Sequence, residues 1–234
     1  GSFHVSSARL GVPSASAIVG GSVPVAVGAA LALRRRGQHG VAVACHGDRS
    51  LAEGATIEAI NLAALWQAPV VFLCENNDAV PYGPREKSDL ATARLTDLVR
   101  PYEVTVKDVD GSDVSATFQA LREAVDRARQ GGPVFLEVLS ANWPGQSGPR
   151  YRLPETLRTN VSLAWDSPQD EFSEWRQCDP LLRFARELLA TGEVNREQLG
   201  VMQAQALADV ESAVRFARES PFPEPASAYD HVFA

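Results

Sequence analysis

The stretch Val41–Asn77, VAVACHGDRSLAEGATIEAINLAALWQAPVVFLCENN, decides the fold class. It begins with a short continuous apolar run at Val41–Cys45 and closes with a second run at Pro69–Cys74. Such runs are typical of strands that are buried on both faces of a parallel sheet. Between the runs, Leu51–Trp66 has the composition and length of a helix. The stretch therefore predicts a strand–helix–strand unit whose two parallel strands are neighbours.

The alternation of helices and apolar strands continues on both sides of this unit. A helix is expected to begin near Pro24, because proline suits the first helical turn, and to stop before Gly37. Further helices are predicted over residues 90–99 and 112–129, and further strands over residues 103–106 and 133–139. This order predicts an α/β fold with a parallel sheet and helices on both faces. Ligands of such sheets bind beyond the carboxyl ends of the strands.

Composition and charge exclude several classes of protein. The chain has 234 residues, of which 45% are apolar, so it can bury a core and disorder is excluded as its main state. Its 22 basic and 29 acidic residues give a net charge of −7. Affinity for phosphate backbones comes from clustered Lys and Arg, so we expect no nucleic-acid partner. The sequence also holds no Ser/His/Asp nucleophile pattern, P-loop or zinc-site spacing.

Cysteine content and hydropathy bear on location. The chain has an odd number of cysteines, Cys45, Cys74 and Cys178, and they show no CxxC spacing. We expect them to be reduced, mostly buried thiols of a cytoplasmic protein. Residues 10–33 carry no charge, but prolines and glycines interrupt them. The strongly apolar part is shorter than the roughly 20 residues that a spanning helix needs. We therefore expect a buried helix there and no membrane partner.

The pattern changes after residue 140. Over residues 141–179 prolines and glycines recur and aromatic residues stand alone, and a loop of this length is usually functional or wraps a partner. Helices are predicted again over residues 180–190 and 196–219. We therefore expect an α/β domain over residues 1–180, which carries the candidate site, and a C-terminal helical extension over residues 181–234 packed on that domain.

Polar side chains follow both strands of the deciding stretch. Asp48 follows the first strand and Asn77 follows the second. Because parallel neighbours end at one edge of the sheet, both side chains can face one crevice. A carboxylate and an amide oxygen suit Mg²⁺, and a helix predicted to start just after Asp48 favours an anion. The pattern thus indicates a Mg²⁺-bound diphosphate, although an Asp and an Asn in turns also commonly cap helices.

Gly47–Asn77, GDRSLAEGATIEAINLAALWQAPVVFLCENN, resembles the thiamine diphosphate signature of the alpha subunits of 2-oxo acid dehydrogenases, in their decarboxylating component. That signature runs from GDG through about 27 residues to NN. Other segments resemble the same family in order: GSFHV at residues 1–5, AIVGGSVPVAVGAALAL at 17–33, GPVFLEVLS at 132–140 and VESAVRFARESPFPEP at 210–225. The family's N-terminal helical region is expected to be missing before the first segment, and the C-terminal end to be complete.

The resemblance implies a fold, a cofactor and a partner. The fold would be the diphosphate-binding half of a thiamine diphosphate enzyme. Thiamine diphosphate and Mg²⁺ would lie at an interface with a beta-type subunit, in an assembly of two alpha and two beta chains. The glutamate that activates the cofactor would belong to the beta subunit. The protein would then supply position and electrostatics, while the cofactor supplies the carbon chemistry.

The resemblance also assigns candidate site residues. The Mg²⁺ ligands would be Asp48, Asn77 and the backbone carbonyl of Ala79. Val19 would pack on the ring system of the cofactor. Gly47, Arg49 and Ser50 lie where contacts with the diphosphate are expected. His4 matches a histidine near the cofactor entry, although a lone surface histidine is an equal interpretation. His46 stands where the family has an aromatic residue, and we expect a packed ring next to the site.

Two departures from the family pattern leave the reaction open. The family's GDG reads Gly47-Asp48-Arg49, and the arginine can clamp a diphosphate or obstruct it. The family's HGHS loop reads Pro144–Ser147, so Gln146 replaces a histidine and cannot shuttle protons near neutral pH. The resemblance implies 2-oxo acid decarboxylation with acyl transfer, with a lipoyl or acyl carrier protein as possible acceptor. The alternatives are transketolase-like transfer of a two-carbon ketol unit and a degenerate, non-catalytic structural subunit.

Overall fold

A parallel sheet of four strands forms the centre of the protein. In the computed structural model, the structure describes residues 4–77, 90, 92, 94–141 and 173–230. The strands are β1 (Ala42–Gly47), β2 (Val70–Asn76), β3 (Thr105–Asp110) and β4 (Val134–Leu139), in the spatial order β1-β2-β4-β3. Every neighbouring pair is parallel. The α/β class and the adjacency of the two strands of the deciding stretch are confirmed.

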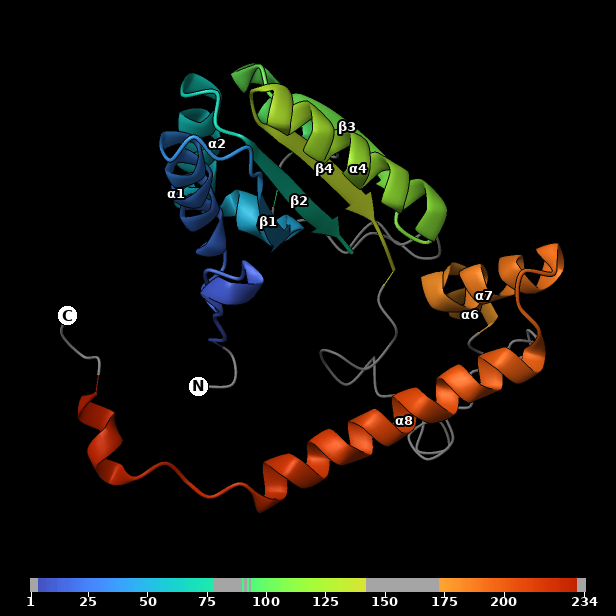
Figure 1. Ribbon diagram of the computed structural model, residues 1–234. Coiled ribbons are helices and arrows are strands. Elements are labelled where there is room, and N and C mark those ends of the chain that lie inside the picture. The colour runs from blue at the N-terminus through green and yellow to red at the C-terminus, as the bar shows by residue number, and fades with distance from the viewer. Residues whose placement is uncertain (1–3, 78–89, 91, 93, 142–172, 231–234) are drawn as a thin grey trace. The chain divides into compact units, whose positions relative to one another are not determined.

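Helices cover both faces of this sheet, as predicted (Figure 1). One hydrophobic cluster lies between the sheet and α1, α2 and α3, and includes the fully buried Phe72 and Phe135. A second cluster lies between the opposite face and α4, and includes Val71 and Leu136. The described helices are α1 (Ser22–Arg35), α2 (Gly54–Leu65), α3 (Leu95–Val99), α4 (Val114–Gln130), α6 (Ser173–Cys178), α7 (Pro180–Thr191) and α8 (Arg196–Glu219).

The prediction that β1 is buried on both faces is wrong. Val43 is 43% exposed and Cys45 is exposed, so the expectation of a buried thiol is also wrong for Cys45. Both residues lie on the sheet face that α4 covers, but α4 packs on β2, β3 and β4. β1 is the edge strand of the described sheet, and its apolar composition does not reveal that its neighbours leave this side open.

The start of the helix in the deciding stretch also differs from the prediction. A short 3-10 helix, η2 (Asp48–Ala52), follows β1, and α2 begins only at Gly54. Glu53 separates the two helices, because its backbone is extended, with φ −84° and ψ 128°. The carbonyl of Glu53 accepts the first hydrogen bonds of α2 from Thr56 and Ile57. The backbone groups next to Asp48 therefore belong to η2 and not to the first turn of an α-helix.

The C-terminal region contains the two helices that the sequence predicts there. α8 begins with a capping box, in which Asn195 accepts a bond from the Gln198 amide and the Gln198 side chain accepts one from the Asn195 amide. The chain divides into two compact units, Gly1–Phe184 and Ala185–Ala234. The packing of the helical extension on the α/β domain stays a prediction. Within the part of the chain that the structure describes, no helix is long and apolar enough to cross a membrane.

Candidate functional site

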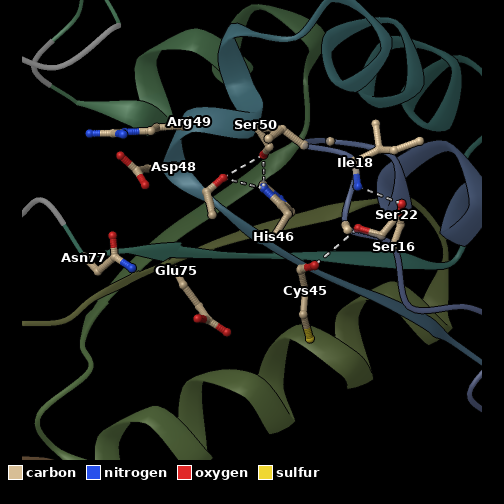
Figure 2. Close-up of a pocket in the computed structure, with 14 residues that line it drawn as sticks. Ser16, Ile18, Ser22, Cys45, His46, Asp48, Arg49, Ser50, Glu75 and Asn77 are labelled. Atoms are coloured by element: carbon tan, nitrogen blue, oxygen red, sulfur yellow. Dashed lines mark hydrogen bonds between the residues drawn. The ribbon is translucent and has the colours of Figure 1, made fainter. Parts of the chain in front are cut away.

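A pocket of about 720 Å³ lies at the carboxyl ends of β1 and β2 (Figure 2). This is the edge of the sheet at which the strand–helix–strand pattern places a ligand. Three segments supply its walls: the approach to α1, the end of β1 with η2, and the end of β2. The lining residues are Ser16, Ala17, Ile18, Val19, Gly20, Ser22, Cys45, His46, Gly47, Asp48, Arg49, Ser50, Glu75 and Asn77.

Asp48 and Asn77 contribute oxygen atoms to this pocket. The backbone register pairs Gly47 of β1 with Glu75 of β2, so the two strands end together and deliver both residues to one edge. Asp48 is only 7% exposed, and Asn77 is half-buried. Figure 2 shows Asp48, Arg49 and Asn77 on the same side of the pocket. This donor set, a carboxylate beside an amide, is one that Mg²⁺ accepts when phosphate and water oxygens complete the shell.

Open space at Gly47 adds to the fit for a phosphate ligand. The Gly47 backbone is extended, with φ −80° and ψ 165°, and a Cβ placed on it would meet no atom within 4 Å. A ligand can therefore approach the backbone closely at this position. The Arg49 side chain is exposed at the pocket and presents a guanidinium, whose planar fork of donors matches phosphate oxygens.

A buried hydrogen-bond network lies behind Asp48. The Ser50 hydroxyl donates to the Gly47 carbonyl over 2.7 Å, and His46 Nδ1 lies 2.6 Å from the same hydroxyl oxygen. His46 is 7% exposed and Ser50 2% exposed. The imidazole also contacts Phe135, with ring centroids 6.1 Å apart, which confirms the packed ring expected next to the site. Burial lowers the pKa of His46 below its ordinary value, because it disfavours the charged imidazolium.

The wall next to α1 depends on one glycine. Gly20 has a left-handed backbone, with φ +73°, and a Cβ at this position would lie 2.5 Å from Thr56 Oγ1. Only glycine therefore allows the segment before α1 to lie against the first turn of α2. This packing places Val19 at the pocket, where it is 56% exposed and could contact an apolar ring.

The end of β2 is fixed by a side-chain hydrogen bond that the sequence pattern does not predict. The Asn76 side-chain amide donates to Glu137 Oε1 over 2.6 Å, and both side chains are buried. Glu137 belongs to β4, the other neighbour of β2. Because Asn76 immediately precedes Asn77, this bond ties the chain to the sheet just before it reaches the pocket.

Six of the predicted site residues line this one pocket: Val19, Gly47, Asp48, Arg49, Ser50 and Asn77. Ala79 and Gln146 lie outside the described residues. His4 is exposed and is not among the lining residues; its Nδ1 lies 3.3 Å from the Ala15 carbonyl. The structure adds Cys45 and Glu75 to the site, and their positions at the ends of predicted strands were the available signal.

The candidate Mg²⁺ set is of a particular kind. Among the described residues, no group of three or more His, Cys, Asp or Glu side chains could hold a metal ion. The set predicted from the sequence has only one carboxylate and takes its other protein oxygens from an amide and a backbone carbonyl. Such a set suits an ion that shares its shell with a ligand's phosphate oxygens.

The fold and the pocket define an α/β protein whose ligand would bind beyond the carboxyl ends of parallel strands. The sequence profile of the family described as "Dehydrogenase E1 component" matches residues 1–145 and 164–226. The chain therefore belongs to the dehydrogenase E1 component family, which confirms the resemblance drawn from its motifs.

Three curated relatives illustrate this membership. The alpha subunit of acetoin:2,6-dichlorophenolindophenol oxidoreductase from Cupriavidus necator is 31% identical over 239 residues, which cover 100% of this chain and 67% of that protein. Its namesake from Bacillus subtilis is 30% identical over 236 residues, covering 100% and 66%. The pyruvate dehydrogenase E1 component subunit alpha from Staphylococcus aureus is 32% identical over 204 residues, covering 85% and 51%. This chain thus spans between about half and two thirds of the length of these relatives.

Proposed function

We propose that this chain is the alpha-type component of a two-chain thiamine diphosphate enzyme. The enzyme cleaves the carbon–carbon bond next to the carbonyl of a 2-oxo acid and transfers the acyl unit to an acceptor. The observation that carries the proposal is the meeting of Asp48 and Asn77 in one pocket at the ends of adjacent parallel strands. Membership in the dehydrogenase E1 component family supports the same reaction class.

In this proposal the chain's own residues hold the diphosphate end of the cofactor. Asp48, Asn77 and the carbonyl of Ala79 are the Mg²⁺ ligands, and Val19 packs on the rings. Gly47 lets the backbone approach the phosphates, and Arg49 donates hydrogen bonds to their oxygens. Bound thiamine diphosphate supplies the electron sink that bond cleavage beside a carbonyl requires.

The partner in this proposal is a beta-type subunit, in an assembly of two alpha and two beta chains in the cytoplasm. The relatives' names describe them as alpha subunits, which supports a second chain. The beta chain supplies the activating glutamate and closes the pocket from the other side. A lipoyl or acyl carrier protein is the proposed acceptor of the acyl unit.

The sequence Pro144–Ser147 supports a second candidate reaction. A glutamine at position 146 cannot serve as a proton shuttle near neutral pH, which weakens a mechanism that needs a histidine there. Transfer of a two-carbon ketol unit to a carrier protein or a sugar is therefore the alternative. A non-catalytic structural subunit would follow only if Arg49 obstructs the diphosphate.

Native mass spectrometry of the chain co-purified with its beta-type partner tests the cofactor site. We expect the wild-type assembly to carry thiamine diphosphate and Mg²⁺. Asp48→Ala should lose both while the assembly persists, because it removes the only carboxylate of the proposed ligand set. Asp126→Ala is the matched control, since Asp126 is exposed on α4 and pairs with Arg129 away from the pocket. An assembled wild-type protein without cofactor at saturating concentrations would contradict the proposal and favour the structural subunit.

A substrate panel then separates the reactions. Pyruvate, branched-chain 2-oxo acids, acetoin and ketose phosphates are offered to the loaded assembly, with 2,6-dichlorophenolindophenol as an artificial acceptor. Reduction of the dye with a 2-oxo acid supports the proposed reaction, and acetoin cleavage would match the relatives' names. Turnover of ketose phosphates alone would support ketol transfer. Turnover of none would contradict both enzymatic functions.

A further inference from the structure

The network behind Asp48 has a feature that packing alone does not require. Two polar side chains, His46 and Ser50, are almost fully buried and bond to each other over 2.6 Å between Nδ1 and Oγ. His46 lies two residues before Asp48, and Ser50 lies two residues after it. Burying a polar group costs free energy unless it is hydrogen-bonded, so the bonds that these two side chains make offset part of that cost and require a defined geometry.

The direction of these bonds follows from their acceptors. The Ser50 hydroxyl donates its single proton to the Gly47 carbonyl, so its oxygen is left to accept. His46 Nδ1 also lies 3.2 Å from the same Gly47 carbonyl, which can only accept. Both contacts therefore require a proton on Nδ1. His46 Nε2 is buried and has no hydrogen-bond partner among the described residues, so the bonds of this imidazole are concentrated on Nδ1.

These bonds all converge on the turn that carries Asp48. The Gly47 carbonyl is held from two sides, by Ser50 and by His46, and Asp48 is the next residue along the chain. The imidazole is itself anchored, since it projects from β1 and packs on Phe135 of the sheet core. The side chain of His46 thus links the sheet core to the turn. Figure 2 shows the network beside Asp48 in the pocket.

We infer that His46 and Ser50 are positioning residues: their hydrogen bonds to each other and to Gly47 hold η2 in the conformation that presents Asp48 to Mg²⁺ and the diphosphate. Neither side chain acts as a ligand in this inference. It rests on the proposed function for the identity of the ligand, whereas the holding of the turn itself can be measured without any ligand.

Substitutions at both positions separate the hydrogen bonds from packing. His46→Phe keeps a ring against Phe135 but removes the donor, and Ser50→Ala keeps nearly the same volume. His46→Asn returns an N–H close to the Nδ1 position, whereas His46→Gln places its amide near Nε2. Ser220→Ala is the matched control, because the Ser220 hydroxyl also donates to a backbone carbonyl, that of Phe216, but on exposed residues at the end of α8.

Affinity for thiamine diphosphate with Mg²⁺ is measured on the assembled alpha–beta protein by calorimetry. His46→Phe and Ser50→Ala should each weaken it about tenfold, an ordinary cost for a disrupted buried hydrogen bond. The double variant should lose less than the hundredfold product of the two single effects, because the bond between His46 and Ser50 is already lost in either single variant. His46→Asn should bind more tightly than His46→Gln, and Ser220→Ala should bind like wild type.

Hydrogen exchange of residues 47–53 in the ligand-free assembly supplies the second readout. Both single variants should exchange faster than wild type in this segment, with α4 unchanged. Exchange and affinity equal to wild type in both variants would overturn the inference and leave the proposed function standing. Additive losses in the double variant, or equal binding by the Asn and Gln variants, would overturn it as well. A wild-type protein that binds no cofactor would refute the proposed function, while the exchange would still test the holding of the turn.

Discussion

β1 and β2 lie side by side in the sheet and have similar sequences, yet they differ in how far they are buried. Both are short apolar runs that end in a cysteine followed by polar residues. β2 lies between β1 and β4 and is buried on both faces for most of its length. β1 is the edge strand of the described sheet, and its residues alternate between buried and exposed.

The difference matters because each strand delivers one half of the candidate site. β2 leads to Asn77 and is fixed by neighbours on both sides, including the Asn76–Glu137 bond. β1 leads to Asp48 and, within the described sheet, pairs with a strand on one side only. A side-chain bond from His46 to Ser50 adds a link between the end of β1 and η2. β2 is therefore held by ladders on both sides and by a side-chain bond, whereas β1 has one ladder in the described sheet and the His46–Ser50 bond at the turn that follows it.

The largest effect is expected from the core of β2. Phe72 is fully buried, so Phe72→Ala should lower the free energy of unfolding by about 3–5 kcal/mol, through lost burial and the cavity it leaves. Phe118→Ala is the matched control, because Phe118 is 63% exposed on α4 and should cost no more than about 0.5 kcal/mol. Urea titration of the free chain measures both. Similar losses at the two sites would refute the placement of Phe72 in the core.

A matched pair of valines compares the two strands directly. Val43 and Val71 are register partners on the same sheet face, but Val71 is fully buried whereas Val43 is partly exposed. Val71→Ala should lower the free energy of unfolding by about 2–3 kcal/mol, and Val43→Ala by less than about 1 kcal/mol. Folding removes less apolar surface from water at Val43 than at Val71. Urea titration of the free chain again gives the values. Equal losses would mean that β1 is covered as fully as β2.

Thiol labelling gives the smallest contrast and a dependence on pH. Burial raises the pKa of Cys74 far above its ordinary value, so this thiol should stay unlabelled in the native protein, whereas Cys45 is exposed and should react with iodoacetamide. Partial burial and the nearby Glu75 carboxylate raise the pKa of Cys45. The labelling rate of Cys45 should therefore increase at higher pH than the rate of a free thiol.

Glu75→Gln removes the negative charge that disfavours the thiolate. The pKa of Cys45 should fall, and labelling near pH 8 should accelerate about two- to threefold. Mass spectrometry of digested peptides follows each cysteine separately. An unchanged rate in Glu75→Gln would show that Glu75 has no electrostatic influence on Cys45. Rapid labelling of Cys74 in the folded protein would contradict the burial of β2.

Much of the site could be predicted because it depends on local pattern and chain order. The apolar runs predict β1 and β2, and because ligands lie at the carboxyl ends of parallel strands, the same pattern predicts a site at Asp48 and Asn77. The family resemblance then added Val19, Arg49 and Ser50, and all of these line the pocket. The start of α2 was mispredicted because nothing in the local composition marks the extended backbone of Glu53.

The fold class, the adjacency of β1 and β2 and the chemical types of the residues beyond them follow from the amino-acid sequence, since hydrophobic periodicity and turn residues act over a few positions. The exposure of one face of β1, the position of Gly20 against Thr56 and the bond between His46 and Ser50 depend on how the helices and strands pack. Burial and buried hydrogen bonds depend on the distance and orientation of side chains on separate elements. Those quantities exist only once helices and strands have packed, so the sequence predicts the candidate ligands of the site but not the bonds that support them.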